Sequence, residues 1–134
     1  MSAAPSERVL DLLVEGLDDW VSLHNVVWHG REQAADFGGD IGAAVRTVVS
    51  TLVIEGLMYP GELGETTIDP WRGGAKELVE RVMRQCQELD WNPQGRGCWF
   101  ANTPEGNRLA AEYLAAEREQ PSGDSSSERR GLPE

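Results

Sequence analysis

The stretch that most constrains the fold is residues 39–63, GDIGAAVRTVVSTLVIEGLMYPGEL. Its apolar residues share one stripe on a helical wheel, which predicts a helix over about 40–55 with one buried side. The stripe contains Ile41, Val45, Val48, Val49 and Leu52. Asp40 is a suitable N-cap, and Gly56 followed by Leu57 is typical of a helix C-terminus. The short segment 57–60 then predicts an edge strand, because Gly61 follows it at once.

Two helices are expected before the helix over about 40–55. Ser6 is placed to cap the first, which carries an apolar stripe and is expected to end near Gly16. Ser22 is placed to cap a short second helix. Residues 29–39 have mixed character, so they are predicted to form a loop that Phe37 pins to the body.

Two more helices are expected after the helix over about 40–55. Residues 61–74 are rich in Gly, Thr and acid and predict an exposed connection, with Leu63, Ile68 and Trp71 as anchors. The stripe over 75–89 is the cleanest in the chain, and its outer face pairs acids with bases at i,i+4 spacing, including Glu80 with Arg84. Residues 97–101 predict an aromatic strand, after which Thr103-Pro104 is a typical helix start.

The length of 134 residues suits one domain, which buries roughly two-thirds of its unfolded surface without needing a disulfide or a metal. The expected class is mainly α with a small β-ribbon (α+β), with about five helices and a two- or three-stranded antiparallel sheet. From about residue 117 apolar residues are almost absent, so 117–134 are predicted to be a disordered tail.

The location expected from the sequence is the cytoplasm. No apolar run approaches the ~20 residues of a membrane span, and the first residues, MSAAPSERVLDLL, do not have the pattern of a signal peptide. Two cysteines, Cys86 and Cys98, agree with a reducing compartment, and both positions suit apolar packing better than a disulfide.

Two motifs resemble the winged-helix superfamily of bacterial type. One is the stop after the central helix, Glu55-Gly56-Leu57-Met58, and the other is the strand Trp99-Phe100-Ala101 that leads into Thr103-Pro104-Glu105-Gly106. The resemblance implies a winged-helix-like domain over 1–116. This chain departs from the family pattern in one place: the helix at about 74–90 lies between the two strands of the wing, where ordinary members have a short tip.

The distribution of charge along the chain indicates where an anionic partner could bind. Residues 1–71 carry three basic and twelve acidic side chains, a net of −9, whereas 72–108 carry six and five, a net of +1. The remaining residues, 109–134, carry three and six, and the chain totals −11. Because an acidic field repels phosphate, anion contacts are expected in residues 72–108 rather than near the opening helix. The candidates are Arg72, Lys76, Arg96 and Arg108.

The resemblance implies that the outer face of the third helix is the interaction surface, since this helix enters the major groove in DNA-binding members. The residues of this face are Ala43, Arg46, Thr47, Ser50 and Ile54. One arginine among small and apolar side chains suits a protein surface better than phosphate and base contacts. Three occupants stay open: another protein, packing on the fourth helix or in a homodimer, and DNA.

Catalytic patterns are weak throughout. His24 and His29 do not share a helical face, and Cys98 lacks an activating neighbour. The acids of 61–74 lack calcium-loop spacing, and no glycine-rich phosphate loop is present. We therefore predict no enzyme activity, cofactor, metal, small-molecule substrate or membrane partner. The sequence favours a regulatory or interaction module that binds a protein or itself. The alternative is a dimeric winged-helix transcriptional regulator.

Overall fold

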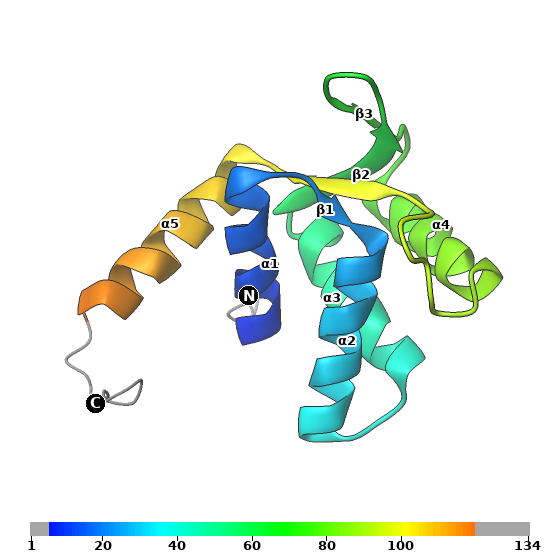
Figure 1. The fold of residues 1–134 in the computed structure, drawn as a ribbon, viewed down its shortest axis with the longest axis horizontal. Coiled ribbons are helices and arrows are strands. Elements are labelled where there is room, and N and C mark those ends of the chain that lie inside the picture. Colours follow the sequence, from blue (N-terminus) through cyan, green and yellow to red (C-terminus); the bar gives the residue numbers. More distant parts are fainter. Residues whose placement is uncertain (1–5, 120–134) are drawn as a thin grey trace.

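The computed structural model describes residues 6–119 and contains five helices and one four-stranded antiparallel sheet within them (Figure 1). The elements in chain order are α1 (Glu7–Asp18), β1 (Val21–Ser22), α2 (Leu23–Phe37), α3 (Ile41–Ile54), β2 (Met58–Leu63), β3 (Ile68–Pro70), α4 (Ala75–Glu88), β4 (Trp99–Asn102) and α5 (Pro104–Glu119). The mainly helical α+β class is confirmed. The sheet has four strands, whereas two or three were expected.

The predicted helix caps are present at three helices. Ser6 and Ser22 accept hydrogen bonds from the backbone of Val9 and Asn25, at 3.3 and 3.2 Å. The Asp40 carboxylate accepts from the first turn of α3. These side chains satisfy backbone N–H groups that the start of a helix leaves without partners, which explains why the N-terminal boundaries were predictable.

The predicted end of α1 at Gly16 is wrong, because the helix continues to Asp18. Gly16 is instead the place where α1 approaches β4. A Cβ atom there would lie 2.3 Å from the side-chain oxygen of Asn102. The Asn102 amide nitrogen donates to the Leu13 carbonyl at 2.8 Å, so this glycine lets the helix and the strand come into contact.

The predicted loop over 29–39 is also wrong. Helix α2 runs through to Phe37, and only the turn from Gly38 to Asp40 separates it from α3. Gly30 does not break the helix, because it lies where α2 crosses α3, and a Cβ atom there would be 2.4 Å from Val45 Cγ2. Phe37 is 81 % exposed, so it does not anchor this segment to the core as predicted.

The core is built on α3, as its apolar stripe predicts. Val45, Val48, Val49 and Leu52 are fully buried, and Ile41 is half-buried at the helix start. Buried side chains from α1, α2, α4 and the sheet join them in one cluster. Helix α3 packs against both α2 and α4, and Figure 1 shows it crossing behind α2, with α1 and α5 to the left of this pair and α4 to the right.

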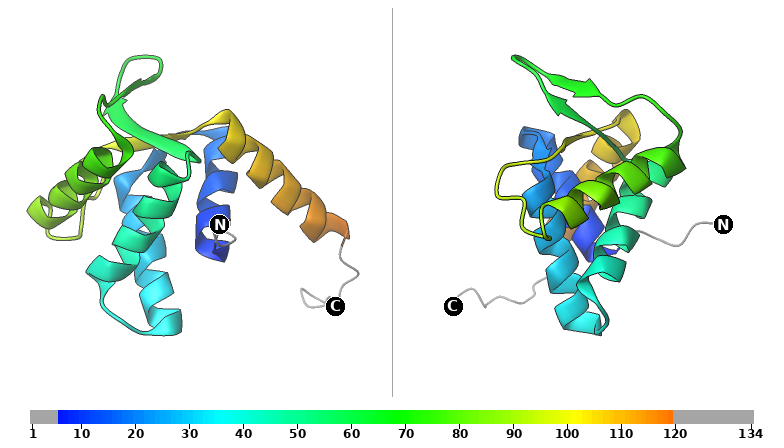
Figure 2. Two further views of the ribbon diagram at one scale, coloured as in Figure 1. Left: turned by 180° about the vertical axis from the view of Figure 1, so that it is seen from behind. Right: turned by 90° about the vertical axis from the view of Figure 1, so that its right-hand side faces the viewer.

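The sheet has the strand order β1-β4-β2-β3, so the strand before α5 lies between the first two strands of the chain. The segment expected to be a plain connection, 61–74, contains the end of β2 and all of β3, which pair as a hairpin. Ile68 and Trp71 are buried anchors as predicted, but Leu63 is 49 % exposed. Leu63 lies near the tip of this hairpin, which projects away from the helices (Figures 1 and 2).

The segment that ends α3, Glu55-Gly56-Leu57-Met58, and the segment that begins α5, Thr103-Pro104-Glu105-Gly106, meet in space. The Thr103 hydroxyl lies 2.6 Å from the Gly56 carbonyl oxygen, to which it donates, and it accepts from the Gly106 backbone. The Thr103 backbone N–H donates to the Leu57 carbonyl oxygen at 3.0 Å. The end of α3 and the start of α5 therefore form one junction across 46 residues of chain.

Helix α4 lies between β3 and β4 in the chain and packs on α3, while α5 packs on α1. Figures 1 and 2 show α4 and α5 at opposite ends of the molecule. Helix α5 ends at Glu119, three residues beyond the predicted domain limit at 116. The rest of the predicted tail lies outside the described residues.

Candidate interaction surface

The outer face of α3 is on the surface. Ala43, Arg46, Thr47 and Ile54 are exposed and Ser50 is half-buried, on the side opposite the core stripe. Ile54 is the largest apolar group of this face and is 48 % exposed. Thr47 donates its hydroxyl proton to the Ala43 carbonyl oxygen at 3.0 Å. That bond satisfies the Thr47 hydroxyl donor within the helix, so Ala43 and Thr47 present small, uncharged groups at the surface.

Arg46, the one basic residue of α3, is held by α4. Its two terminal nitrogens donate to the two carboxylate oxygens of Glu80 at 2.6 and 3.2 Å. This hydrogen-bonded pair lowers the pKa of Glu80 and raises that of Arg46. Both partners therefore stay ionised, and the charge that Arg46 brings to the face is balanced by a carboxylate beside it.

Glu80 was expected to pair along α4 with Arg84. The structure instead uses it to join two helices, and Arg81 likewise turns off the helix toward the hairpin. The Arg81 guanidinium lies 3.8 Å from the centre of the Trp71 ring, and the Trp71 indole donates to Glu62 at 2.8 Å. Helix α4 is thus attached both to α3 and to the β2–β3 hairpin.

The other two arginines of residues 6–71 also have internal acceptors. Arg8 of α1 donates to Asp36 near the end of α2 at 2.8 Å. Arg31 donates to the backbone carbonyl of Trp91 at 2.5 Å. With Arg46 bound to Glu80, every cation in this part of the described chain has an acceptor, against twelve acidic residues. Its surface field is therefore negative.

The four predicted anion contacts do not gather on one surface. Arg72 and Lys76 are exposed at the start of α4, and Arg96 lies in the loop after that helix. Arg108 is on α5, where Glu105 and Glu112 both accept from its guanidinium, and these bonds raise its pKa. Since α4 and α5 lie at opposite ends of the molecule (Figure 1), Arg108 is far from the other three.

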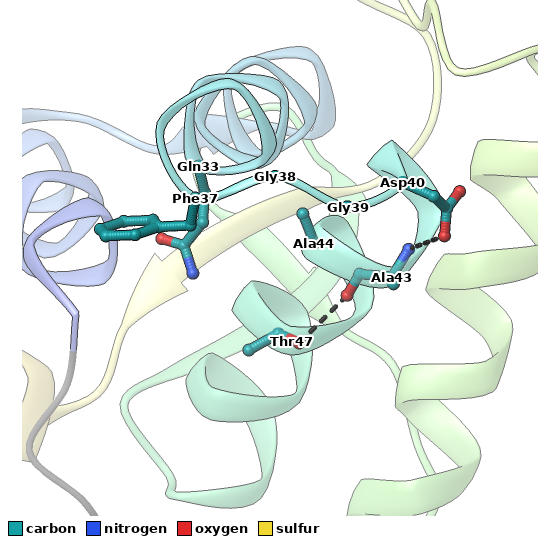
Figure 3. Close-up of a pocket in the computed structure, with 8 residues that line it drawn as sticks. All are labelled: Gln33, Phe37, Gly38, Gly39, Asp40, Ala43, Ala44 and Thr47. Carbon is teal, nitrogen blue, oxygen red and sulfur yellow. Dashed lines mark hydrogen bonds between the residues drawn. The ribbon is translucent and has the colours of Figure 1, made fainter.

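A shallow pocket opens where α2 meets α3, with a volume of about 220 Å³ (Figure 3). Gln33 and Phe37 line it from α2, Gly38 and Gly39 from the turn, and Asp40, Ala43, Ala44 and Thr47 from the start of α3. Ala43 and Thr47 belong to both this pocket and the outer face of α3. A loop over residues 29–39 would not form this pocket, which depends on α2 continuing to Phe37.

Neither a protein-family model, nor a curated protein, nor a solved structure matches this chain. Across residues 6–119, no group of three or more His, Cys, Asp and Glu side chains is arranged to hold a metal ion. No single helix among these residues is long and apolar enough to cross a membrane. Helices α2 and α3 reach that length and apolar character only as a pair, which is bent by 119°.

The two histidines have structural partners. His29 is 4 % exposed, and its Nε2 lies 2.9 Å from a carboxylate oxygen of Glu15, which links α2 to α1. His24 Nδ1 accepts from the backbone of Gln94 at 3.2 Å and thereby holds the loop after α4. His29 was predicted to lie in a loop, and this buried position follows from the longer α2.

The two cysteines are free thiols in the core, as their apolar context predicted. Burial raises the pKa of the Cys86 thiol to about 11 and raises that of Cys98 as well. A thiol is a poor nucleophile when its pKa is raised, because the reactive form is the thiolate. Both side chains therefore serve packing.

Proposed function

We propose that this chain is a non-catalytic, winged-helix-like interaction module that acts in the cytoplasm and binds a protein partner through the outer face of α3. The observation that carries the proposal is the bidentate ion pair between Arg46 and Glu80. This contact balances the charge of Arg46, and the other residues of the face, Ala43, Thr47, Ser50 and Ile54, are uncharged.

The topology supports the winged-helix part of the proposal. Three helices precede the main strands, and the order β1-β4-β2 places the strand before the last helix between the other two. The hairpin strand β3 and helix α4 are inserted between β2 and β4, where a winged helix has its wing. Fold alone does not give function, so the choice of partner rests on the surface.

Charge and desolvation favour a protein over DNA. A DNA-binding α3 would have to release Arg46 from Glu80, which would leave a carboxylate beside the phosphates and reduce the electrostatic gain. The methyl and hydroxyl groups of Ala43 and Thr47, by contrast, lose little when water is removed, and the half-exposed Ile54 supplies apolar area.

The test compares two variants that place a lysine on matched surfaces. Ile54 and Leu63 are 48 % and 49 % exposed, but only Ile54 lies on α3. A partner is captured on the immobilised full chain, purified, and titrated against each form by calorimetry. We expect Ile54→Lys to raise the Kd for the captured partner by at least about tenfold, and Leu63→Lys to raise it by less than about threefold.

Two results would contradict the proposal. Equal weakening by both variants would show a general effect of charge, and unchanged binding by Ile54→Lys would show that the α3 face is not used. The same lysine on α3 should strengthen DNA binding if DNA is the natural ligand. Ile54→Lys therefore separates the protein partner from the alternative of a DNA-binding regulator by the sign of its effect.

A further inference from the structure

The core-facing stripe of α2 continues past the place where α1 begins. Val26 and Gly30 are buried on this stripe, and Gln33 and Phe37 follow at helical spacing. Arg8 in the first turn of α1 pairs with Asp36, which places the start of α1 beside the end of α2. Figures 1 and 2 show the joined ends of α2 and α3 extending below α1, so no other helix of the described chain covers the last turn of the stripe.

We call this end of the helix pair the α2–α3 corner, made of Gln33, Phe37, Gly38, Gly39, Asp40 and Thr47 around the pocket in Figure 3. Phe37 is 81 % exposed, the highest value among the large apolar side chains of the described chain. An aromatic ring on a core-facing stripe loses much unfavourable contact with water when a partner covers it.

The turn beside Phe37 is open to close approach. Gly38 and Gly39 have φ angles of +83° and +100°, and a Cβ atom at either would meet no heavy atom within 4 Å. A backbone without side chains lets another chain approach its surface directly. The corner therefore combines an apolar anchor with space next to it.

The polar groups of the corner suit a donor with positive charge. The Gln33 side-chain oxygen is buried and has no hydrogen-bond partner among the described residues, which leaves an acceptor to be satisfied. Glu32, Asp36 and Asp40 are the carboxylates of this end of α2 and α3. Arg8 pairs with Asp36, and Asp40 accepts from the first turn of α3, so three acids stand against one paired cation. An acidic rim attracts a basic segment and repels a second copy of a chain with net charge −11.

We propose that the α2–α3 corner docks a short basic segment of a partner protein, with one apolar side chain on Phe37 and Lys or Arg side chains toward the acidic rim. This inference rests on the proposed function and names the chemistry of the partner. For its buried oxygen to accept from a donor of that segment, the Gln33 side chain has to turn toward the pocket that it lines. Thr47 joins the corner to the α3 face.

Fluorine NMR tests this directly, because the chain has only two phenylalanines. In a chain labelled with 4-fluorophenylalanine, Phe37 reports on the corner, and the fully buried Phe100 reports on the core. The probe is an amphipathic peptide of about 14 residues built from Leu and Lys, and its control replaces every Lys by Glu. We expect the Leu/Lys peptide to shift the Phe37 signal saturably, to leave Phe100 unchanged, and to bind more weakly at high salt.

Matched variants locate the contact. Ala43 lines the pocket, whereas Ala35 is exposed on α2 and does not. We expect Ala43→Lys to raise the Kd of the Leu/Lys peptide by at least about tenfold through like-charge repulsion. Ala35→Lys should raise this Kd by less than about threefold.

Several results would overturn the docking proposal. These are an equal shift with the Leu/Glu peptide, no shift with either peptide, or equal effects of Ala43→Lys and Ala35→Lys. A Phe37 signal that moves with protein concentration would identify a second copy as the occupant. A signal that moves on deletion of residues 1–5 would identify the chain's own first residues. The α3 proposal fails separately, because it depends on Ile54→Lys and the captured partner.

Discussion

Gly106→Ala is expected to destabilise the domain by about 2–3 kcal/mol, because it breaks the junction between the end of α3 and the start of α5. A Cβ atom at Gly106 would lie 2.1 Å from the Leu57 carbonyl oxygen. That oxygen cannot turn away without losing the backbone hydrogen bond from Thr103. Helix α5 would have to lift from the body and lose packing against α1.

The measurement is urea unfolding followed by tryptophan fluorescence, with Tm from circular dichroism. Gly42→Ala is the matched control, since Gly42 also lies in the first turn of a helix but a Cβ atom there meets only ordinary contacts at 3.4 Å. We expect Gly42→Ala to leave stability unchanged or raise it by up to about 1 kcal/mol. If Gly106→Ala behaved in the same way, the two motifs would not form a tight junction.

Gly30→Val is expected to cost about 3 kcal/mol or more, which corresponds to a Tm lower by roughly 10 °C. The added Cβ would lie 2.4 Å from Val45 Cγ2 and 3.1 Å from Val45 Cα. Rotation of the Val45 side chain relieves only the first of these contacts. The second involves backbone, so α2 and α3 must separate, and the surface they build together is distorted.

A double-mutant cycle with Val45→Ala checks this reason by urea unfolding. Because Val45→Ala removes the nearest atom, the double variant should be less destabilised than the sum of the two single variants by at least about 1 kcal/mol. Strictly additive losses would mean that Gly30 does not act through its contact with Val45.

The parts of the fold that were predictable depend on signals local to the chain. The start and end of α3, its buried stripe and the caps Ser6, Ser22 and Asp40 all follow from residues within a turn or two of one another. The length of α2 was not predictable in this way. A glycine usually weakens a helix, and only the contact of Gly30 with Val45 explains why the helix continues through it.

The candidate surface was predictable in its position but not in its chemistry. The opposite side of a buried stripe must face outward, so Ala43, Thr47 and Ile54 were identified from α3 alone. The state of Arg46 depends on Glu80, which is 34 residues away in the chain. The exposure of Phe37 depends on where α1 begins relative to α2. Both are properties of packing between elements, which local patterns do not contain.

We propose that the α3 face binds protein and not DNA. The most direct test of this claim is a fluorescence anisotropy titration of a labelled random-sequence duplex at about 50 mM salt, where non-specific electrostatic binding is strongest. Since Glu80 balances Arg46 and the chain carries a net charge of −11, we expect no binding up to about 100 μM protein. Binding tighter than about 10 μM that weakens steeply with added salt would contradict the claim and favour the DNA-binding regulator.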